Sequence, residues 1–244
     1  TGMGGRSNRN GGVRSTQGLS QGITLIPMGY DMSQGGIKAA GQYNAAISGQ
    51  GFFILQNENS NQQLLTRASD FIFAADGTLV DVFGRKLKGY KVTNGVADKS
   101  AMVDIKLDPE TYNLTDVGFE DGGILTTNYT ARQAAMNSGT DEPIPEGEET
   151  FQLALAYVPN ASQMDQSAGN TFKTNLKSGS VSYYGVADEQ AFGSVIGASS
   201  ESSNVNPAET TIVGIQLQRA YNATQGALTM TNKFLTQIMD IAGK

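Results

Sequence analysis

The chain has 244 residues, of which 39% are hydrophobic and 16% charged, and its formal net charge is −6. This acidic balance excludes a nucleic-acid binder that works through a basic face, because such a face is needed to displace counterions from phosphates. The chain contains no Cys, His or Trp. Catalytic triads and dyads, structural zinc and haem ligation that depend on Cys or His are therefore excluded.

The length is typical of one or two domains with a core of moderate size. No apolar run approaches the roughly 20 residues that a membrane-spanning helix needs. The first five residues, Thr1 to Gly5, lack the basic and apolar regions of a secretory signal. Since the chain begins at Thr rather than Met, we expect any export signal to lie upstream of Thr1.

Residues 1–44 are predicted to form an extended arm. Gly, Ser, Asn and Gln dominate from Arg6 to Gly22, and such a segment buries too little apolar surface to offset the entropy lost on ordering. The one candidate strand is Ile23–Ile26. Two interpretations stay open: a flexible tail, or a segment that becomes ordered when it packs on a neighbouring subunit.

Residues 45–97 are dense in β patterns. The apolar stretch from Ala46 to Leu55 contains Gly49 and Gly51, where the backbone must turn or approach another segment closely, so it is a bent strand or a strand pair. Residues 71–80 predict a hairpin, because Asp76-Gly77 supplies the positive φ angles of a tight turn. Together with residues 169–206, this region is predicted to form an inner domain of short antiparallel strands.

Residues 98–168 are predicted to form an inserted outer β domain. Polar and apolar residues alternate in the segments 102–107 and 151–158, as expected for half-buried strands. Residues 141–149 are acidic and contain proline. Their carboxylates are suitable calcium ligands, but they lack the spacing of an EF-hand loop, and a solvated loop is the preferred interpretation.

The last segment, residues 207–244, predicts one helix about 55 Å long. Asn206 is a suitable N-cap, Pro207 suits the first helical position, and Glu209 lies where a capping-box glutamate reaches back to the cap. Apolar residues recur at steps of three and four and form one stripe. This stripe consists of Val213, Leu217, Ala220, Tyr221, Ala227, Leu228, Phe234, Leu235, Ile238 and Ile241.

The remainder of this helix is polar but almost uncharged. The opposite face is predicted to hold Gln216, Asn222, Gln225, Thr229, Asn232 and Gln237. The only charged residues are Glu209, Arg219, Lys233, Asp240 and Lys244. Solvated helices usually carry many charged pairs, so this helix is predicted to be surrounded by other helices or to face a narrow, wet space.

Several motifs occur in the order and spacing of a known family. They are Ser33-Gln34-Gly35, Ala46 to Phe53, Leu65 to Ala68, Asp76 to Val80, Gly84 to Tyr90, Glu201 to Asn206 and Gln218 to Ala223. In these motifs the chain resembles bacterial flagellar rod and hook proteins. The matching positions that we single out are Gly49, Gly51, Phe52, Phe53, Arg67, Asp76, Gly77, Asn204 and Arg219. One departure is that Ser200, just before Glu201, replaces the usual leucine.

The resemblance implies a mainly β protein with a coiled-coil-type terminal helix. It also implies helical polymerisation into a hollow flagellar tube that transmits torque and passes exported subunits, with terminal helices inside, β domains outside, and neighbouring rod, hook or junction proteins as further partners. The family pairs an N-terminal helix with the C-terminal one, and we expect that helix upstream of Thr1. The sequence does not separate rod from hook. We hypothesise that polymerisation uses one set of side chains, which pack against that N-terminal helix and against neighbouring subunits: Val213, Leu217, Tyr221, Leu228, Leu235 and Ile238.

Two other function classes are compatible with parts of the sequence. An enzyme without His or Cys could use paired carboxylates, and Asp116, Glu120 and Asp121 are candidates, although nothing distinguishes them from surface charges. A phage-tail-like or adhesin β protein that binds glycans would expose aromatic clusters, for which the candidates are Tyr112, Phe119 and Tyr129. The preferred prediction is a structural protein of the extracellular or periplasmic flagellum, with no catalytic residues, cofactor, metal or membrane span.

Overall fold

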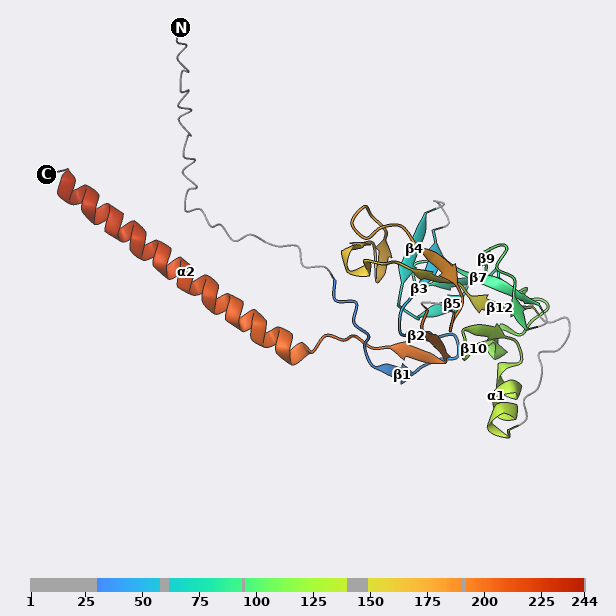
Figure 1. Ribbon diagram of the computed structural model, residues 1–244. Helices are drawn as coiled ribbons and strands as arrows, with labels where there is room; N and C mark the ends of the chain where they lie inside the picture. Colours follow the sequence, from blue (N-terminus) through green and yellow to red (C-terminus); the bar gives the residue numbers. More distant parts are fainter. Residues whose placement is uncertain (1–29, 58–61, 94, 140–148, 190–191, 244) are drawn as a thin grey trace, which may run out of the picture.

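The computed structural model describes residues 30–57, 62–93, 95–139, 149–189 and 192–243. The predicted strand at Ile23–Ile26, and residues 141–148 of the acidic loop, lie outside these ranges. In the described part, a β-rich body is followed by one long helix that projects away from it (Figure 1). The predicted fold class, mainly antiparallel β with a long C-terminal helix, is confirmed.

The body is built from short strands. They are β1 (Ile37–Ala39), β2 (Ala45–Ser48), β3 (Phe52–Gln56), β4 (Gln63–Thr66), β5 (Phe71–Phe73), β6 (Leu79–Asp81), β7 (Lys86–Thr93), β8 (Val96–Ala97), β9 (Val103–Asp104), β10 (Gly118–Glu120), β11 (Ile124–Thr126), β12 (Thr150–Leu153), β13 (Leu155–Tyr157), β14 (Asp165–Gln166), β15 (Thr171–Lys173), β16 (Tyr183–Gly185), β17 (Ser194–Gly197) and β18 (Ser199–Glu201). The helices are α1 (Tyr129–Asn137) and α2 (Pro207–Ala242), with 3₁₀ turns at Leu114–Asp116 and Ala161–Gln163.

All strand pairings of the described residues are antiparallel. The main sheet runs in the order β10-β11-β12-β7-β3-β4-β15-β14, and β13 joins it by pairing with both β3 and β16. Two smaller pairs, β2 with β17 and β1 with β18, connect this body to the chain segments that lead away from it. The body therefore ends in a two-stranded connection, β1–β18, beside the start of α2 (Figure 1).

Strand β3 shows how the sequence builds two apolar layers. Its side chains alternate between faces, as in any strand. Phe53 and Leu55 enter the larger core cluster, whereas Phe52 and Ile54 enter a smaller one on the other side of the sheet. Because all four side chains are buried, β3 is a central strand covered on both faces.

The glycine-containing stretch at 46–55 forms two strands rather than one bent strand. Gly49 and Gly51 have φ angles of +114° and +132°, which side-chain-bearing residues rarely adopt. The break separates β2, which pairs with β17, from β3, which pairs with β4, β7 and β13. The hairpin predicted at 71–80 is present as β5 and β6, with Gly77 at φ +78° in the turn.

Residues 98–168 share the sheet and the core with the preceding strands. Strands β8 and β9, on either side of the predicted boundary at residue 98, both pair with β7. The larger cluster combines side chains from both segments, for example Phe53 with Phe119 and Leu153. The segments predicted as inner and outer domains are therefore continuous in packing.

Three local predictions for residues 98–168 were wrong in detail. The segment 102–107 is a strand only at β9, and the segment 151–158 is interrupted at Ala154, whose N–H bonds to the carbonyl of Lys88 instead of continuing a single strand. The region also contains α1, which an all-β interpretation missed. The composition of α1 contained the signal, because Ala, Arg, Gln and Met favour helices.

Helix α2 begins at the predicted residue and ends at Ala242, two residues short of the predicted end. None of its residues is buried. The described residues thus divide into a body held by two apolar clusters and a helix that has no apolar contact layer of its own.

Candidate assembly site

The outstanding feature of α2 is the apolar surface that it leaves in contact with solvent. Leu217, Leu228 and Leu235 are 66%, 58% and 53% exposed. The other large apolar side chains exposed along the helix are Ile212, Val213, Ile215, Tyr221, Met230, Phe234, Ile238, Met239 and Ile241. Monomeric proteins rarely expose a continuous apolar surface of this size, so it marks a place where other protein surface packs.

Part of this surface follows a coiled-coil register. From Leu217 onward, residues at alternating steps of four and three lie on one line along the helix, which is the spacing that two supercoiled helices share. We call this line the α2 seam; it consists of Leu217, Tyr221, Thr224, Leu228, Thr231, Leu235, Ile238 and Ala242. Val213 continues the stripe one turn earlier.

The two threonines of the α2 seam are suited to burial. The hydroxyls of Thr224 and Thr231 donate to the backbone carbonyls of Ala220 and Ala227, both at 2.9 Å. A buried hydroxyl costs free energy only when its hydrogen bond is unmade, and these hydroxyls have partners within the helix itself. The two threonines can therefore enter an interface without leaving their hydroxyl donors unsatisfied.

Outside the seam, α2 carries exposed polar side chains together with the apolar side chains of Ile212, Ile215, Met230, Phe234, Met239 and Ile241. Asn222, Thr229 and Asn232 are exposed, and Arg219 is exposed among them. The amide of Gln225 donates to the hydroxyl of Tyr221 at 3.1 Å, which links the polar surface to the edge of the seam. Gln216 and Gln237 are exposed as well.

The start of α2 is defined by its cap. The side-chain oxygen of Asn206 accepts a hydrogen bond from the N–H of Ala208 at 3.1 Å. Glu209 lies in the first turn, where a carboxylate interacts favourably with the helix dipole. Among the hydrogen bonds of the described residues, none joins Glu209 to Asn206, so the capping box expected there is not formed.

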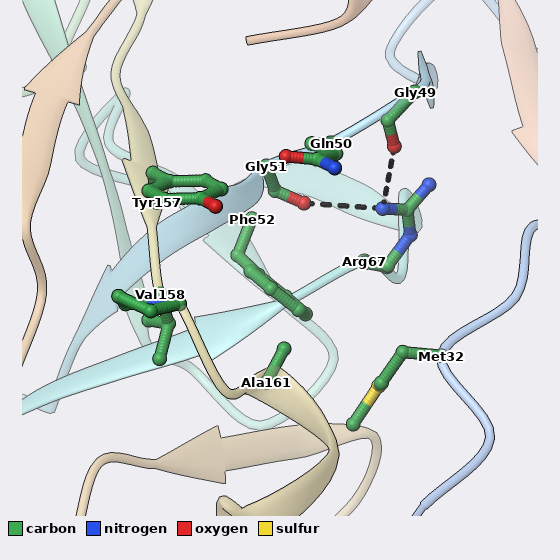
Figure 2. Close-up of a pocket in the computed structure, with 10 residues that line it drawn as sticks. Met32, Gly49, Gln50, Gly51, Phe52, Arg67, Tyr157, Val158 and Ala161 are labelled. Carbon is green, nitrogen blue, oxygen red and sulfur yellow. Dashed lines mark hydrogen bonds between the residues drawn. The ribbon is translucent and has the colours of Figure 1, made fainter. Parts of the chain in front are cut away.

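The motif residues of the body gather around Arg67, which directly follows β4. Its guanidinium donates to the carbonyls of Ile47, Gly49 and Gly51 at 3.1, 3.0 and 3.2 Å. Its Nε donates to the carboxylate of Glu201 at 2.9 Å. Figure 2 shows the guanidinium pointing at the carbonyls of Gly49 and Gly51. The contacts of Arg67 bring the motifs Ala46–Phe53, Leu65–Ala68 and Glu201–Asn206 into one cluster.

The other motif residues have separate structural tasks. Asp76 accepts hydrogen bonds from the N–H and hydroxyl of Thr78, at 3.1 and 2.8 Å, and these bonds hold the pKa of Asp76 below its usual value. Gly77 occupies the same turn. Asn204 donates to the carbonyl and hydroxyl of Ser33, at 3.0 and 2.8 Å. These bonds join the segment just before β1 to the segment just after β18.

A cavity of about 190 Å³ lies beside Arg67. Its lining is mostly apolar and includes Met32, Phe52, Val158 and Ala161 (Figure 2). Because the polar groups of Arg67 already bind backbone and carboxylate, the cavity offers neither a nucleophile nor a paired acid and base.

The carboxylates weighed for catalysis are engaged in structural contacts. Glu120 is buried and paired with Arg132 at 2.5 Å. Asp116 accepts from the N–H and hydroxyl of Thr130, which lower the pKa of Asp116. Asp121 accepts from the N–H of Gly197 at 3.1 Å. Within the described ranges, no group of three or more acidic side chains could hold a metal ion.

The aromatic residues weighed for glycan binding do not form an exposed cluster. Phe119 is fully buried in the larger core cluster, and Tyr112 packs against that cluster. Tyr129 is half-buried at the start of α1. Among the residues that the structure describes, none of the helices combines the length and hydrophobicity needed to cross a bilayer.

Comparison with known proteins agrees with the motifs. Residues 46–127 match the family described as flagellar hook protein FlgE/F/G D1 domain. The flagellar hook protein FlgE of Rhizobium meliloti (strain 1021) is 29% identical over 138 residues, which cover 56% of this chain. The match spans 32% of that relative's length.

A solved structure, the flagellar hook protein FlgE2 of Helicobacter pylori, matches 29% of this chain and 21% of its own, with 21% identity and a TM-score of 0.23. A score this low does not establish a shared fold. The resemblance to flagellar rod and hook proteins is nevertheless confirmed by the sequence matches, which include the stretch from β2 to β11.

Proposed function

From the confirmed resemblance to flagellar rod and hook proteins, we propose that this chain is a structural subunit of the flagellar axial structure that polymerises helically into a hollow tube. Its partners in this proposal are copies of itself and neighbouring rod, hook or junction proteins. It acts outside the cytoplasm, in the basal body or hook, as a mechanical element that transmits torque and performs no catalysis.

The observation that carries the proposal is the exposed α2 seam. Fully burying a large apolar side chain is worth about 1.5–3 kcal/mol. Since the seam leucines are each 53–66% exposed, an interface gains roughly half of that value from each of them. Gains of this size must offset the loss of translational and rotational freedom on association, so several neighbouring helices are needed rather than one. A tube core, in which each helix has many neighbours, meets that need.

The polar surface of α2 supports the position of the helix within the tube. We propose that Asn222, Thr229 and Asn232 face the central channel, where neutral polar groups let unfolded subunits pass without adhering. Charged groups would bind charged segments of the passing chain, and apolar groups would bind its exposed hydrophobic residues; Ile215 and Arg219 are the exceptions near Asn222. A density map of the assembled tube with this surface packed against protein would refute this placement.

The experiment that tests assembly is a concentration series of the purified chain. Sedimentation velocity and negative-stain electron microscopy are expected to show a monomer at low concentration and helical tubes at high concentration. A glycan-binding protein would stay monomeric or form small closed oligomers. A chain that forms no repeating assembly across the series, while α2 stays helical, would contradict the proposed function.

A further inference from the structure

The two strands that connect the body to α2 are held by polar contacts. We call residues 30–39 and 199–206, which include β1 and β18, the connector. Ile37 is half-buried, Lys38 and Ala39 are exposed, and no residue of β1 or β18 belongs to either apolar cluster. The apolar contacts of the connector come from its first residues, where Met32 packs against the smaller cluster and Tyr30 meets the ring of Phe172, and not from its two strands.

Arg67 and Glu201 bind the connector to the body. Their side chains are 16% and 12% exposed, so the ion pair is largely shielded from water. One carboxylate oxygen of Glu201 accepts from Arg67 Nε, and the other accepts from the N–H of Gly35 at 2.9 Å. Glu201 thus holds one strand of the connector to the body and to the other strand at the same time.

The guanidinium of Arg67 is anchored on the opposite side. Its N–H groups donate to the carbonyls of Ile47, Gly49 and Gly51, and its Cζ atom lies 5.9 Å from the ring centre of Phe52. The rigid fork of an arginine can satisfy carbonyls and a carboxylate together, whereas a lysine ammonium has one small head group.

Flanking contacts confine the same segment. The side chain of Gln34 accepts from the N–H of Gly49 at 2.9 Å. Gly35 lies so close to the other strand that a Cβ on it would be 1.7 Å from the carbonyl oxygen of Ser202. The backbones of Gly35 and Ser202 are therefore packed directly against each other, next to the point where Glu201 binds the N–H of Gly35.

We propose that Arg67, Glu201 and the backbone groups that they bind form a polar latch that sets the angle between the body and α2. The lever is long, because 36 helical residues span about 54 Å. A rotation of about 10° at the connector displaces the far end of α2 by about 9 Å. One ion pair thus controls where the α2 seam is presented, whether or not the chain assembles.

The test measures the connector in the isolated chain, so its outcome is independent of tube formation. Because the chain has no cysteine, Glu110→Cys in the body and Gln218→Cys on α2 provide a unique pair of spin-label sites. Both residues are exposed. Their distance distribution is measured by double electron–electron resonance in otherwise unchanged protein and in the latch variants Glu201→Gln and Arg67→Lys.

Both latch variants are expected to broaden the distance distribution. They are also expected to raise hydrogen exchange at least about tenfold at the amides of Ser202 and Ala40, which bond across the connector strands. Exchange at the amide of Leu153, which bonds within the body, should stay unchanged. The matched control is Lys91→Gln, which breaks an exposed ion pair with Glu149 and should change neither measurement.

Two results would overturn the latch. Unchanged distance distribution and connector exchange in both variants would show that the angle is set elsewhere. Equal loss of protection at Leu153 and Ser202 would show that the pair supports folding of the body as a whole.

Discussion

The most informative perturbation of the proposed tube is to place charge on the α2 seam. In the isolated chain Leu228 and Leu235 are 58% and 53% exposed, so the double substitution Leu228→Asp, Leu235→Asp removes no core contact from the body. In an assembly, the two leucines would lose roughly half of their full burial value each, about 1.5–3 kcal/mol together. At 1.4 kcal/mol per factor of ten, the concentration needed for assembly rises at least about tenfold.

Burying unpaired carboxylates raises this cost further, by several kcal/mol per charge. We expect the variant to remain monomeric in sedimentation velocity at concentrations where the unchanged chain forms tubes, with the same thermal unfolding of its β body. The matched control, Asn222→Asp with Asn232→Asp, adds the same charge to the polar surface of α2 and should assemble. Tubes formed by the seam variant at unchanged concentration would refute the role of the seam.

Three further predictions concern the body. Gly77→Ala should destabilise it by at least about 1–3 kcal/mol in thermal unfolding, because the φ angle is +78° and a Cβ would lie 1.8 Å from the carbonyl oxygen of Leu107. Gly84→Ala, at φ +75° with open space around it, should cost less, and equal losses in the two variants would contradict the steric explanation. Arg85→Ala should cost about 3–5 kcal/mol in denaturant unfolding, because it leaves its buried carboxylate partner unpaired, whereas Lys91→Ala, in an exposed pair, should cost under about 1 kcal/mol. Hydrogen bonds from Thr130 lower the pKa of Asp116 in the folded state. The ionised carboxylate therefore stabilises the fold above the usual pKa, and this stabilisation is lost as the pH falls through the lowered pKa. Asp116→Asn should reduce the loss of stability between roughly pH 5 and 2, and an unchanged acid unfolding profile would contradict this.

The elements that sequence reasoning located well are those with local signals. The start of α2 follows from Asn206 and Pro207, and its apolar surface follows from side chains spaced at three and four residues. The β5–β6 hairpin follows from Asp76-Gly77, since a tight turn requires a positive φ there. Each of these features is determined within a few residues of chain.

The features that sequence reasoning missed depend on distant partners. The pattern of residues 151–158 alternates through Ala154, yet the chain changes strand there because Ala154 bonds to Lys88. Arg67 was recognisable as a motif position, but Glu201 lies 134 residues away in sequence, and nothing local indicates that the two meet. The shared core of residues 45–97 and 98–168 likewise arises from strand pairings that alternation alone does not specify.

The most direct test of the central claim is an electron cryo-microscopy map of the chain at the concentration where it assembles. The account predicts a hollow helical tube with α2 in the inner layer, Leu228 and Leu235 buried between neighbouring helices, and the β body outside. A particle in which those two leucines stay in solvent, or pack on the β body of their own chain, would contradict it.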